Sequence, residues 1–257
     1  MTEILLLSNL GLGDNIFSIS AINYLSEKYK VSVIVKKHNY EIFKNFFTDK
    51  NIDFFIVKGD NEVNKLFGNK LLMTYNNKKI LRTGCHKINS NLSTFPFFMY
   101  DDINIPREVL KTHFKVRNTD KAISLYNSTD NMKYAFICNE TSDGELFGID
   151  NVLNQLKINK HETLIICSNK NVYDKTHKFH KISEKFVYKT NNINILDYKL
   201  IIENAEYNIL TDSSLFCFAI QLNIINNNNF IISRSEYKWI NWNNLFKFYN
   251  NKFKLLG

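Results

Sequence analysis

Short apolar runs alternate with longer amphipathic segments along most of this 257-residue chain. The run 3–8, with the sequence EILLLS, is typical of a buried strand, and a helical pattern follows it from about Asp14 to Tyr29. Such alternation predicts βαβ units, in which helices cover a parallel sheet. The other predicted strands are 31–35, 53–57, 70–75, 133–138, 163–168, 185–188, 207–210 and 230–233. The other predicted helices are 39–47, 61–67, 147–157, 195–205, 213–222 and 235–250, and 171–181 is expected to be helical or irregular.

The two series of strands and helices predict an α/β protein with two Rossmann-like domains. We expect an N-terminal domain over 1–117, a linker over 118–131 and a C-terminal domain over 132–257, with 76–130 less regular than the rest. Open parallel sheets bind ligands beyond the carboxyl ends of their strands. Two such domains facing each other would therefore place a site in the cleft between them.

Composition and charge narrow the class of partner. Hydrophobic residues make up 44% of the chain, as in a globular protein, and the formal net charge is +8. A positive field favours anionic ligands and acidic membrane surfaces. However, the lysines are scattered, with nothing longer than pairs such as Lys36-Lys37, whereas a nucleic-acid site is more often a clustered stripe. We therefore expect no nucleic-acid partner, and peripheral contact with a membrane is a secondary expectation.

The four cysteines and the apolar runs indicate a cytoplasmic protein. No Cys-x-x-Cys occurs, and three of the cysteines lie in apolar runs, which is typical of buried free thiols in a reducing compartment. The N-terminal apolar run is too short for a signal peptide, and no stretch of 18 apolar residues predicts a membrane span.

The stretch 8–15, SNLGLGDN, places Gly11, Gly13 and Asp14 between the first strand and the first helix. It differs from the dinucleotide-binding fingerprint, because Ile16 stands at the third glycine position. The second strand also ends in lysines, without the acidic residue that binds a ribose, and the chain has no Gly-Lys-Ser/Thr phosphate loop. The corner is thus expected to bind neither a nicotinamide nor a flavin cofactor.

Two roles for Asp14 remain. It is a preferred residue for capping a helix, and local sequence alone favours this alternative. Asp14 could instead be the catalytic base that accepts a proton from a substrate hydroxyl. In that case Gly11 and Gly13 would let the acceptor approach the backbone, with Asn15 as a further acceptor contact.

A second polar corner follows the strand 207–210. Asp212, Ser213 and Ser214 open an apolar helix there, and a strand-to-helix turn of this kind suits a diphosphate, although an ordinary cap by Asp212 or Ser213 is an equal alternative. The loops after two preceding strands add further expected donor contacts. These are Asn139, Thr141, Ser142, Ser168 and Lys170.

Together the two corners resemble a known family. LGLGDNIFSISAINYLSEKY resembles the N-terminal motif of the ADP-heptose:lipopolysaccharide heptosyltransferases, and LIIENAEYNILTDSSLFCFAIQL resembles their C-terminal motif. The resemblance implies the GT-B architecture and an inverting, metal-independent glycosyltransferase without a cofactor. It implies that Asp14 is the catalytic base and that the turn 212–214 holds a sugar nucleotide, with a glycan or glycolipid as acceptor.

The sequence departs from the family pattern in the second half. Ser214 replaces a glycine, Cys217 replaces a histidine, and the loop after 133–138 lacks the family's lysine. A cation for the donor phosphates would then come from elsewhere, with Lys170 or Arg234 as candidates. Two alternatives remain open: a sugar-nucleotide epimerase or hydrolase of the same fold, and a non-catalytic nucleotide- or nucleic-acid-binding protein. His177-x-x-His180 has no third ligand nearby in the sequence, so we expect no metal site.

Overall fold

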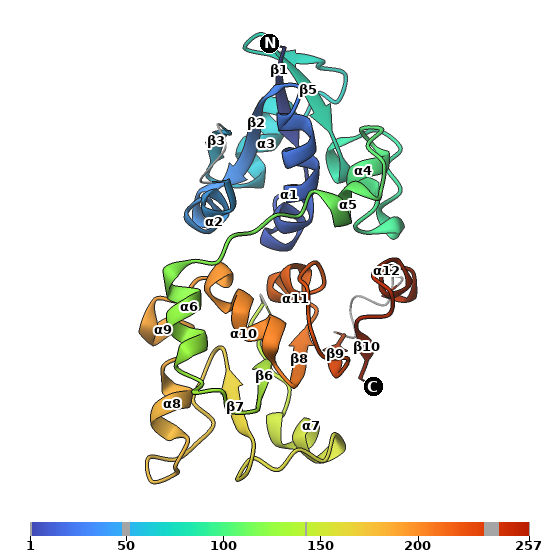
Figure 1. The fold of residues 1–257 in the computed structure, drawn as a ribbon. Coiled ribbons are helices and arrows are strands. Elements are labelled where there is room, and N and C mark those ends of the chain that lie inside the picture. Colours follow the sequence, from blue (N-terminus) through green and yellow to red (C-terminus); the bar gives the residue numbers. More distant parts are fainter. Residues whose placement is uncertain (1, 48–51, 142, 234–241, 257) are drawn as a thin grey trace. The chain divides into compact units, whose positions relative to one another are not determined.

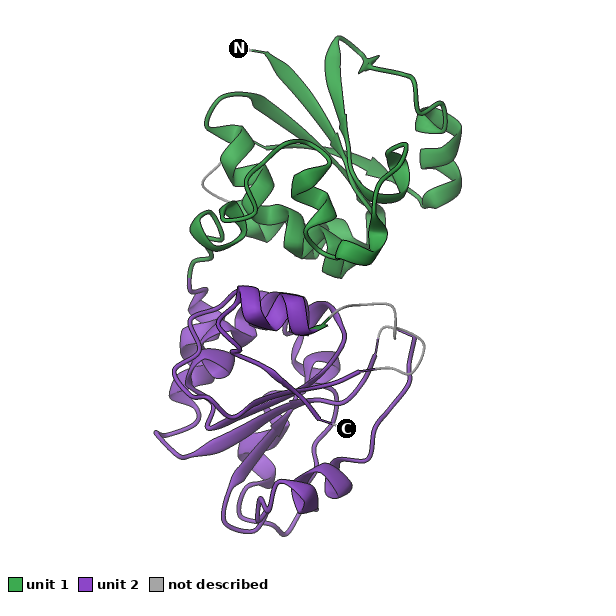
Figure 2. Cartoon of the chain, turned by 90° about the vertical axis from the view of Figure 1, so that its right-hand side faces the viewer, with its two compact units in different colours: residues 1–117, 239–242 green, residues 118–238, 243–257 purple. Residues whose placement is uncertain are grey.

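The computed structural model describes residues 2–47, 52–141, 143–233 and 242–256 (Figure 1). The chain divides into two compact units (Figure 2): unit 1 comprises residues 1–117 with 239–242, and unit 2 comprises 118–238 with 243–257. Each unit is an α/β domain built on one predominantly parallel sheet, as the sequence predicts. The acceptor and donor roles of the two units, and a cleft between them, stay predictions.

The sheet of unit 1 has the order β3-β2-β1-β5-β4, and all pairs are parallel except β4 with β5. Its strands are β1 (Glu3–Leu7), β2 (Lys30–Lys36), β3 (Asp53–Val57), β4 (Thr74–Tyr75) and β5 (Lys78–Arg82). Its helices are α1 (Leu12–Ser26), α2 (Lys37–Phe43), η1 (Lys44–Phe47), α3 (Asp60–Phe67), η2 (Gly84–His86), η3 (Leu92–Thr94), α4 (Phe98–Asp101) and α5 (Val109–Thr112). The strand β1 therefore lies at the centre, between β2 and β5.

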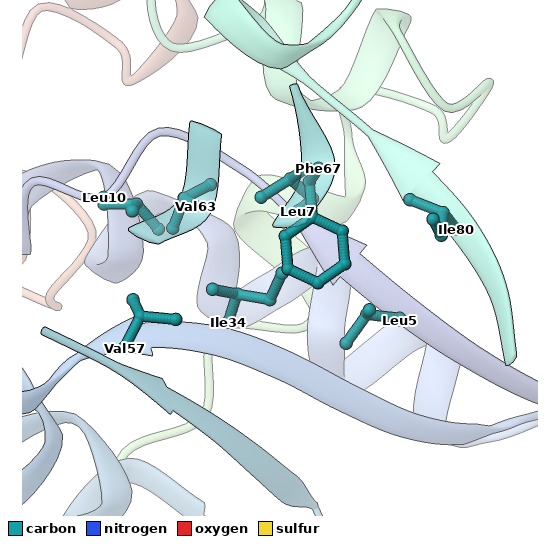
Figure 3. Packing of buried hydrophobic residues seen from close by; sticks show 8 residues of the cluster. All are labelled: Leu5, Leu7, Leu10, Ile34, Val57, Val63, Phe67 and Ile80. Atoms are coloured by element: carbon teal, nitrogen blue, oxygen red, sulfur yellow. The ribbon is translucent and has the colours of Figure 1, made fainter. Parts of the chain in front are cut away.

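An apolar cluster covers one face of this sheet (Figure 3). Alternate residues of β1, Leu5 and Leu7, pack there with Val63 and Phe67 of α3, because side chains two apart on a strand share a face. All of these side chains are almost fully buried. Burial on this scale supplies most of the free energy that holds α3 on the sheet.

Helix α1 is buried on all sides and contacts β2, α2, α4 and α5. Three side-chain hydrogen bonds tie it to the segment that follows the sheet. The Tyr100 hydroxyl donates to Phe17 O at 2.6 Å, Ser20 Oγ donates to Leu110 O at 3.2 Å, and Asn23 Nδ2 donates to His113 O at 2.8 Å. Polar side chains on a buried helix need such partners. These bonds fix where α1 begins as well as where it lies.

Unit 2 has a sheet of order β10-β9-β8-β6-β7, in which every pair is parallel. Its strands are β6 (Tyr134–Cys138), β7 (Leu164–Cys167), β8 (Tyr207–Thr211), β9 (Asn229–Ile232) and β10 (Lys254–Leu255). Its helices are α6 (Asp120–Asn127), α7 (Ile149–Gln155), α8 (His180–Glu184), α9 (Tyr188–Asn191), η4 (Ile195–Tyr198), α10 (Lys199–Asn204), α11 (Ser214–Ala219) and α12 (Trp242–Phe248). Strand β6 and the edge strand β7 are buried throughout, as parallel strands with both faces covered must be.

Several sequence predictions differ from the structure. The predicted strand 70–75 is a strand only at β4, and the parallel neighbour of β1 is β5, in the stretch expected to be irregular. Leu71 and Met73 misled the prediction because they are apolar yet highly exposed. The predicted strand 185–188 is wrong, since Phe186 and Val187 are buried in a loop that leads into α9.

Segment 118–131, expected to be a linker, contains helix α6 and lies in unit 2. Thr119 caps α6 by accepting from Ala122 N, and its hydroxyl donates to the Asp197 carboxylate at 2.7 Å. The closing helix, expected over 235–250, is described at α12, and 234–241 lie outside the described residues. No described helix is long and apolar enough to cross a membrane.

Tyr100→Phe should lower the free energy of unfolding by about 1 kcal/mol, because a buried hydroxyl bond to the backbone of α1 is lost. Urea unfolding of the full chain measures the change. Tyr29→Phe is the matched control, since the Tyr29 hydroxyl has no hydrogen bond to a described residue and is partly exposed. Equal losses in the two variants would show that the Tyr100 hydroxyl does not hold α1.

Candidate active site

Asp14 is the third residue of α1, not its cap. The helix begins at Leu12. Its N-cap residue is Gly11, which has no side chain with which to cap the helix. The capping alternative for Asp14 is therefore wrong in its geometry. A carboxylate in the first turn of a helix still gains from the partial positive charge of the unpaired backbone N–H groups there.

Gly11 matters because it leaves room for the carboxylate. A Cβ at this position would lie 2.6 Å from Asp14 Oδ2, closer than such atoms approach in proteins. The backbone of Gly11 has a φ of −65° and is extended, so other residues could adopt its conformation. The requirement for glycine is thus one of space. Gly13 lies in the first turn of α1, beside Asp14.

The loops after β1 and β5 meet at the carboxyl end of the sheet. The chain leaves β1 toward β2 on one side and returns to β5 on the other, which makes this a topological switch point. The Thr83 N–H donates to Leu7 O at 2.9 Å. Beyond it, the Cys85 N–H donates to Asn9 Oδ1 at 3.0 Å, and Asn9 Nδ2 donates to Asp14 Oδ1 at 3.3 Å. Asn9 and Cys85 are neighbours of Asp14 that the sequence analysis did not select.

The loop 84–90 is fixed in turn by Asp102. Its carboxylate accepts from the Gly84 N–H at 2.8 Å and from Ser90 Oγ at 2.7 Å, and it forms an ion pair with Lys87 at 3.5 Å. Gly84 has a φ of +61°, a conformation that favours glycine. A Cβ on Gly84 would collide with Asn9 Oδ1 and would lie 2.8 Å from Phe98 Cε2.

Burial raises the pKa of Asp14 to about 6. The bond from Asn9, the backbone N–H of Asp14 itself and the positive charge of Lys36 oppose this rise. The Lys36 ammonium is also paired with Asp60 at 2.7 Å. Burial raises the pKa of Cys85 as well, and the negative charge of Asp14 adds to this effect. A carboxylate with a pKa near neutrality suits proton transfer.

Asn15, a predicted acceptor contact, is fully buried on α1. Neither its amide nitrogen nor its oxygen has a hydrogen-bond partner within the described part of the chain. A buried unpaired amide is costly, so a water molecule or a ligand group that reached Asn15 would be stabilised. Its contact with an acceptor stays a prediction.

In unit 2, the loops after β6, β7 and β8 converge on the Cys138 thiol. Burial raises the pKa of this thiol, while the hydroxyls of Ser168, Ser213 and Thr211 lie against it and oppose the rise. The strand β6 lies between β7 and β8, so this is the switch point of the second sheet. The structure therefore brings Ser168 and the turn 211–214 together, as the sequence predicts.

The turn 211–214 has fewer free donors than expected. Ser213 is at the N-cap position of α11, but its side chain makes no cap bond and its N–H donates to Thr211 O at 2.8 Å. Asp212 is buried and precedes the cap position, so neither residue is an ordinary side-chain cap. Ser214 is the first residue of α11. A diphosphate seat at this turn stays a prediction, with Ser214 N–H rather than Ser213 N–H as its donor.

Two residues that were predicted to contact the donor, Asn139 and Thr141, instead form hydrogen bonds within their own loop. The Asn139 side chain is almost fully buried, and its Nδ2 donates to Phe147 O at 2.9 Å. The Thr141 hydroxyl bonds with Asp143, and it accepts from the Glu145 N–H at 2.9 Å. We therefore assign Asn139 and Thr141 to holding the loop. Ser142 lies outside the described residues.

The cations near this edge differ from those expected. Lys170 is exposed just beyond β7, and Arg234 lies outside the described residues. Lys189 of α9, which the sequence analysis did not select, forms an ion pair with Glu140 at 3.3 Å. Glu140 directly follows Asn139 after β6, and its carbonyl accepts from Thr211 Oγ1 at 3.2 Å. Lys189 therefore lies next to the loops of the switch point. Within the described ranges, no group of three or more His, Cys, Asp or Glu could hold a metal ion.

Comparison with solved structures finds the same fold in glycosyltransferases. Escherichia coli ADP-heptose LPS heptosyltransferase II matches with a TM-score of 0.55 and 11% identity, over 99% of this chain and 90% of that one. A family 9 glycosyl transferase from Veillonella parvula DSM 2008 matches with a TM-score of 0.51 and 12% identity, over 99% and 85%. The iron-containing dodecameric glycosyltransferase TibC from enterotoxigenic E. coli H10407 matches with a TM-score of 0.50 and 11% identity, over 90% and 58%.

No protein-family profile and no curated protein matches the sequence. The structural matches confirm the GT-B-like fold that the two motifs predict. At 11–12% identity they show a common fold, and the chemistry has to be argued from the site.

Gly84→Ala should lower the free energy of unfolding by about 2–4 kcal/mol, through backbone strain and collision with Asn9 and Phe98. Gly144→Ala is the matched control, because Gly144 also has a positive φ, of +88°, but nothing lies within 4 Å of its Cβ position. It should cost only about 1 kcal/mol. Urea unfolding measures both. A loss at Gly84 no larger than at Gly144 would contradict close packing against Asn9.

Asp14→Asn should stabilise the chain at neutral pH. The pKa of Asp14 is raised from 3.8 in the unfolded chain to about 6 in the folded chain. Ionisation of Asp14 therefore has no effect on folding below pH 3.8, opposes folding increasingly between pH 3.8 and 6, and opposes it fully above pH 6. The variant should gain about 1–2 kcal/mol at pH 7.5, after discount for partial exposure, and almost none at pH 4. Urea unfolding at both pH values measures the gain. A variant that is destabilised at pH 7.5 would mean that the carboxylate is structural.

Proposed function

We propose that this chain is an inverting, metal-independent glycosyltransferase that moves a sugar from a nucleoside-diphosphate donor to a hydroxyl of a glycan or glycolipid. The observation that supports this most is the half-buried Asp14 carboxylate at the switch point of unit 1. It lies in a fold shared with structures described as glycosyltransferases.

In this proposal Asp14 is the catalytic base. Its pKa of about 6 keeps it mostly ionised at neutral pH, yet high enough to accept a proton from a hydroxyl as that oxygen attacks. The acceptor O–H bond breaks, its proton passes to Asp14, and the oxygen bonds to the anomeric carbon. The bond between that carbon and the diphosphate oxygen breaks on the opposite face, and the diphosphate leaves with the electron pair. A single displacement of this kind inverts the configuration.

The leaving diphosphate gains negative charge, which the protein has to stabilise. We assign this role to the carboxyl edge of the sheet in unit 2, through the Ser214 N–H, Lys189 and Lys170. The Ser213 N–H is already bonded to Thr211 O and is left out. The net charge of +8 supports an anionic donor, because a positive field raises the local concentration of anions. In this scheme the protein needs no cofactor, and chelators should leave its activity unchanged.

Asp14→Asn should reduce sugar transfer by about 10²–10⁴-fold, since an amide cannot accept the proton, while donor binding is kept. A thermal-shift screen against nucleoside diphosphates and their sugars identifies the donor, and transfer to added glycans is then followed by mass. Protection by a donor should be equal in the wild-type chain and the variant.

Glu62→Gln is the matched control, because Glu62 is the third residue of α3 just as Asp14 is the third residue of α1. It should transfer sugar at the wild-type rate. Sugar transfer at the wild-type rate by Asp14→Asn would refute the role of Asp14 as the catalytic base. Loss of the donor sugar without any labelled acceptor would instead indicate a hydrolase.

A further inference from the structure

Asn9 links the two loops that meet at the switch point of unit 1. It lies between β1 and α1, accepts from the Cys85 N–H at 3.0 Å and donates to Asp14 Oδ1 at 3.3 Å. Cys85 follows Thr83 and Gly84 at the end of β5, some 76 residues further along the chain. A single amide side chain therefore joins the carboxylate of α1 to the neighbouring strand's loop.

The direction of this amide is determined by its partners. A backbone N–H can only donate, so the Asn9 oxygen has to face Cys85, and the nitrogen has to face Asp14. Gly84 packs directly against the amide, since a Cβ there would collide with Asn9 Oδ1 and lie 2.9 Å from Asn9 Cγ. Asp102, the residue directly after α4, in turn holds Gly84 and Ser90. The amide is thus fixed by a rigid loop and not by Asp14 alone.

The two carboxylate oxygens of Asp14 are consequently in different surroundings. Oδ1 accepts the bond from Asn9, whereas Oδ2 is turned toward Gly11, which leaves it the space that a side chain would fill. Among described side chains, the hydrogen bond to this carboxylate goes to Oδ1, and the oxygen without such a donor is the better proton acceptor of the two.

We propose that Asn9 is a positioning residue that engages Asp14 Oδ1 and thereby presents Oδ2 as the atom that takes the proton of the acceptor hydroxyl. This inference rests on the proposed function for the identity of the proton's source. The orientation of the carboxylate does not depend on it. The titratable groups that face Asp14 are Lys36 at the end of β2 and Cys85 after β5.

The test measures the titration of Asp14 without any substrate. The carboxyl carbon of Asp14 is observed by ¹³C NMR in the full chain with labelled aspartate, and its signal is assigned by its loss in Asp14→Asn. Asn9→Ala removes a donor to the charged form, so the pKa of Asp14 should rise by about one pH unit. Asn9→Asp keeps the acceptor for the Cys85 N–H and the shape of the side chain, and should raise the pKa further through like-charge repulsion.

Asn39→Ala is the matched control. Asn39 Nδ2 donates to Leu10 O at 3.2 Å, so it holds the same loop without touching Asp14, and its removal should leave the pKa of Asp14 unchanged. An unchanged pKa in both Asn9 variants would overturn the proposal. An equal rise in Asn39→Ala would also overturn it, because loop stability alone would then explain the effect.

The outcome is separable from that of the proposed function. If Asp14→Asn transfers sugar normally, the glycosyltransferase mechanism fails, whatever the titration shows. If the mechanism holds, Asn9→Ala should lower kcat by about 10–100-fold with the donor KM unchanged, because the base is misplaced and the donor site is not. Wild-type kcat in Asn9→Ala would show that Asn9 does not position the base.

Discussion

The burial of α1 is the constraint on which the first unit depends. This helix is enclosed by the sheet and by the segment that contains α4 and α5, and its polar side chains bond to backbone carbonyls of that segment. A helix enclosed in this way cannot shift along its axis without breaking those bonds and opening cavities in the core. Its first turn is therefore held at the carboxyl edge of the sheet, with Asp14 in a fixed place.

The chemistry proposed for Asp14 follows from that placement. A carboxylate in the first turn would ordinarily be stabilised in its charged form by the helix dipole. Here burial outweighs the Asn9 bond, the backbone N–H of Asp14 and the charge of Lys36, so the pKa rises to about 6. The ionised Asp14 carboxylate destabilises the fold in this position, and such destabilisation is typical of functional sites. Unit 2 differs, since its buried groups at the switch point bond mostly to one another.

The sequence predicts those parts of the fold that depend on periodicity. Buried strands such as 31–35 and 207–210 are found almost at the predicted residues, since continuous apolar runs between polar turns have few other solutions. Strand β5 was missed because Leu71 and Met73, exposed in the structure, gave the stronger apolar signal. The short apolar run at 185–188 also led to a wrong strand prediction, because a buried loop and a buried strand have the same apolar sequence pattern.

The site was predictable only where one segment carries it. Asp14 and Gly11 are adjacent to the first strand, so the motif identified both. Asn9 and Cys85 could not be paired from the sequence, because their bond depends on β5 lying beside β1. In unit 2 the polar residues after β6 were correctly identified as a loop, but sequence does not tell whether Asn139 and Thr141 bond to a ligand or to the loop itself. The glycine at position 84, which has a positive φ in the structure, was a local sequence signal for the missed loop.

The pH dependence of kcat/KM for sugar transfer tests the central claim most directly. The account predicts an acidic limb with an apparent pKa near 6, below which the rate falls tenfold per pH unit as Asp14 takes up a proton. A rate that stays constant between pH 7 and pH 5, or a limb only near the ordinary aspartate value of 3.8, would contradict the half-buried Asp14 as the base.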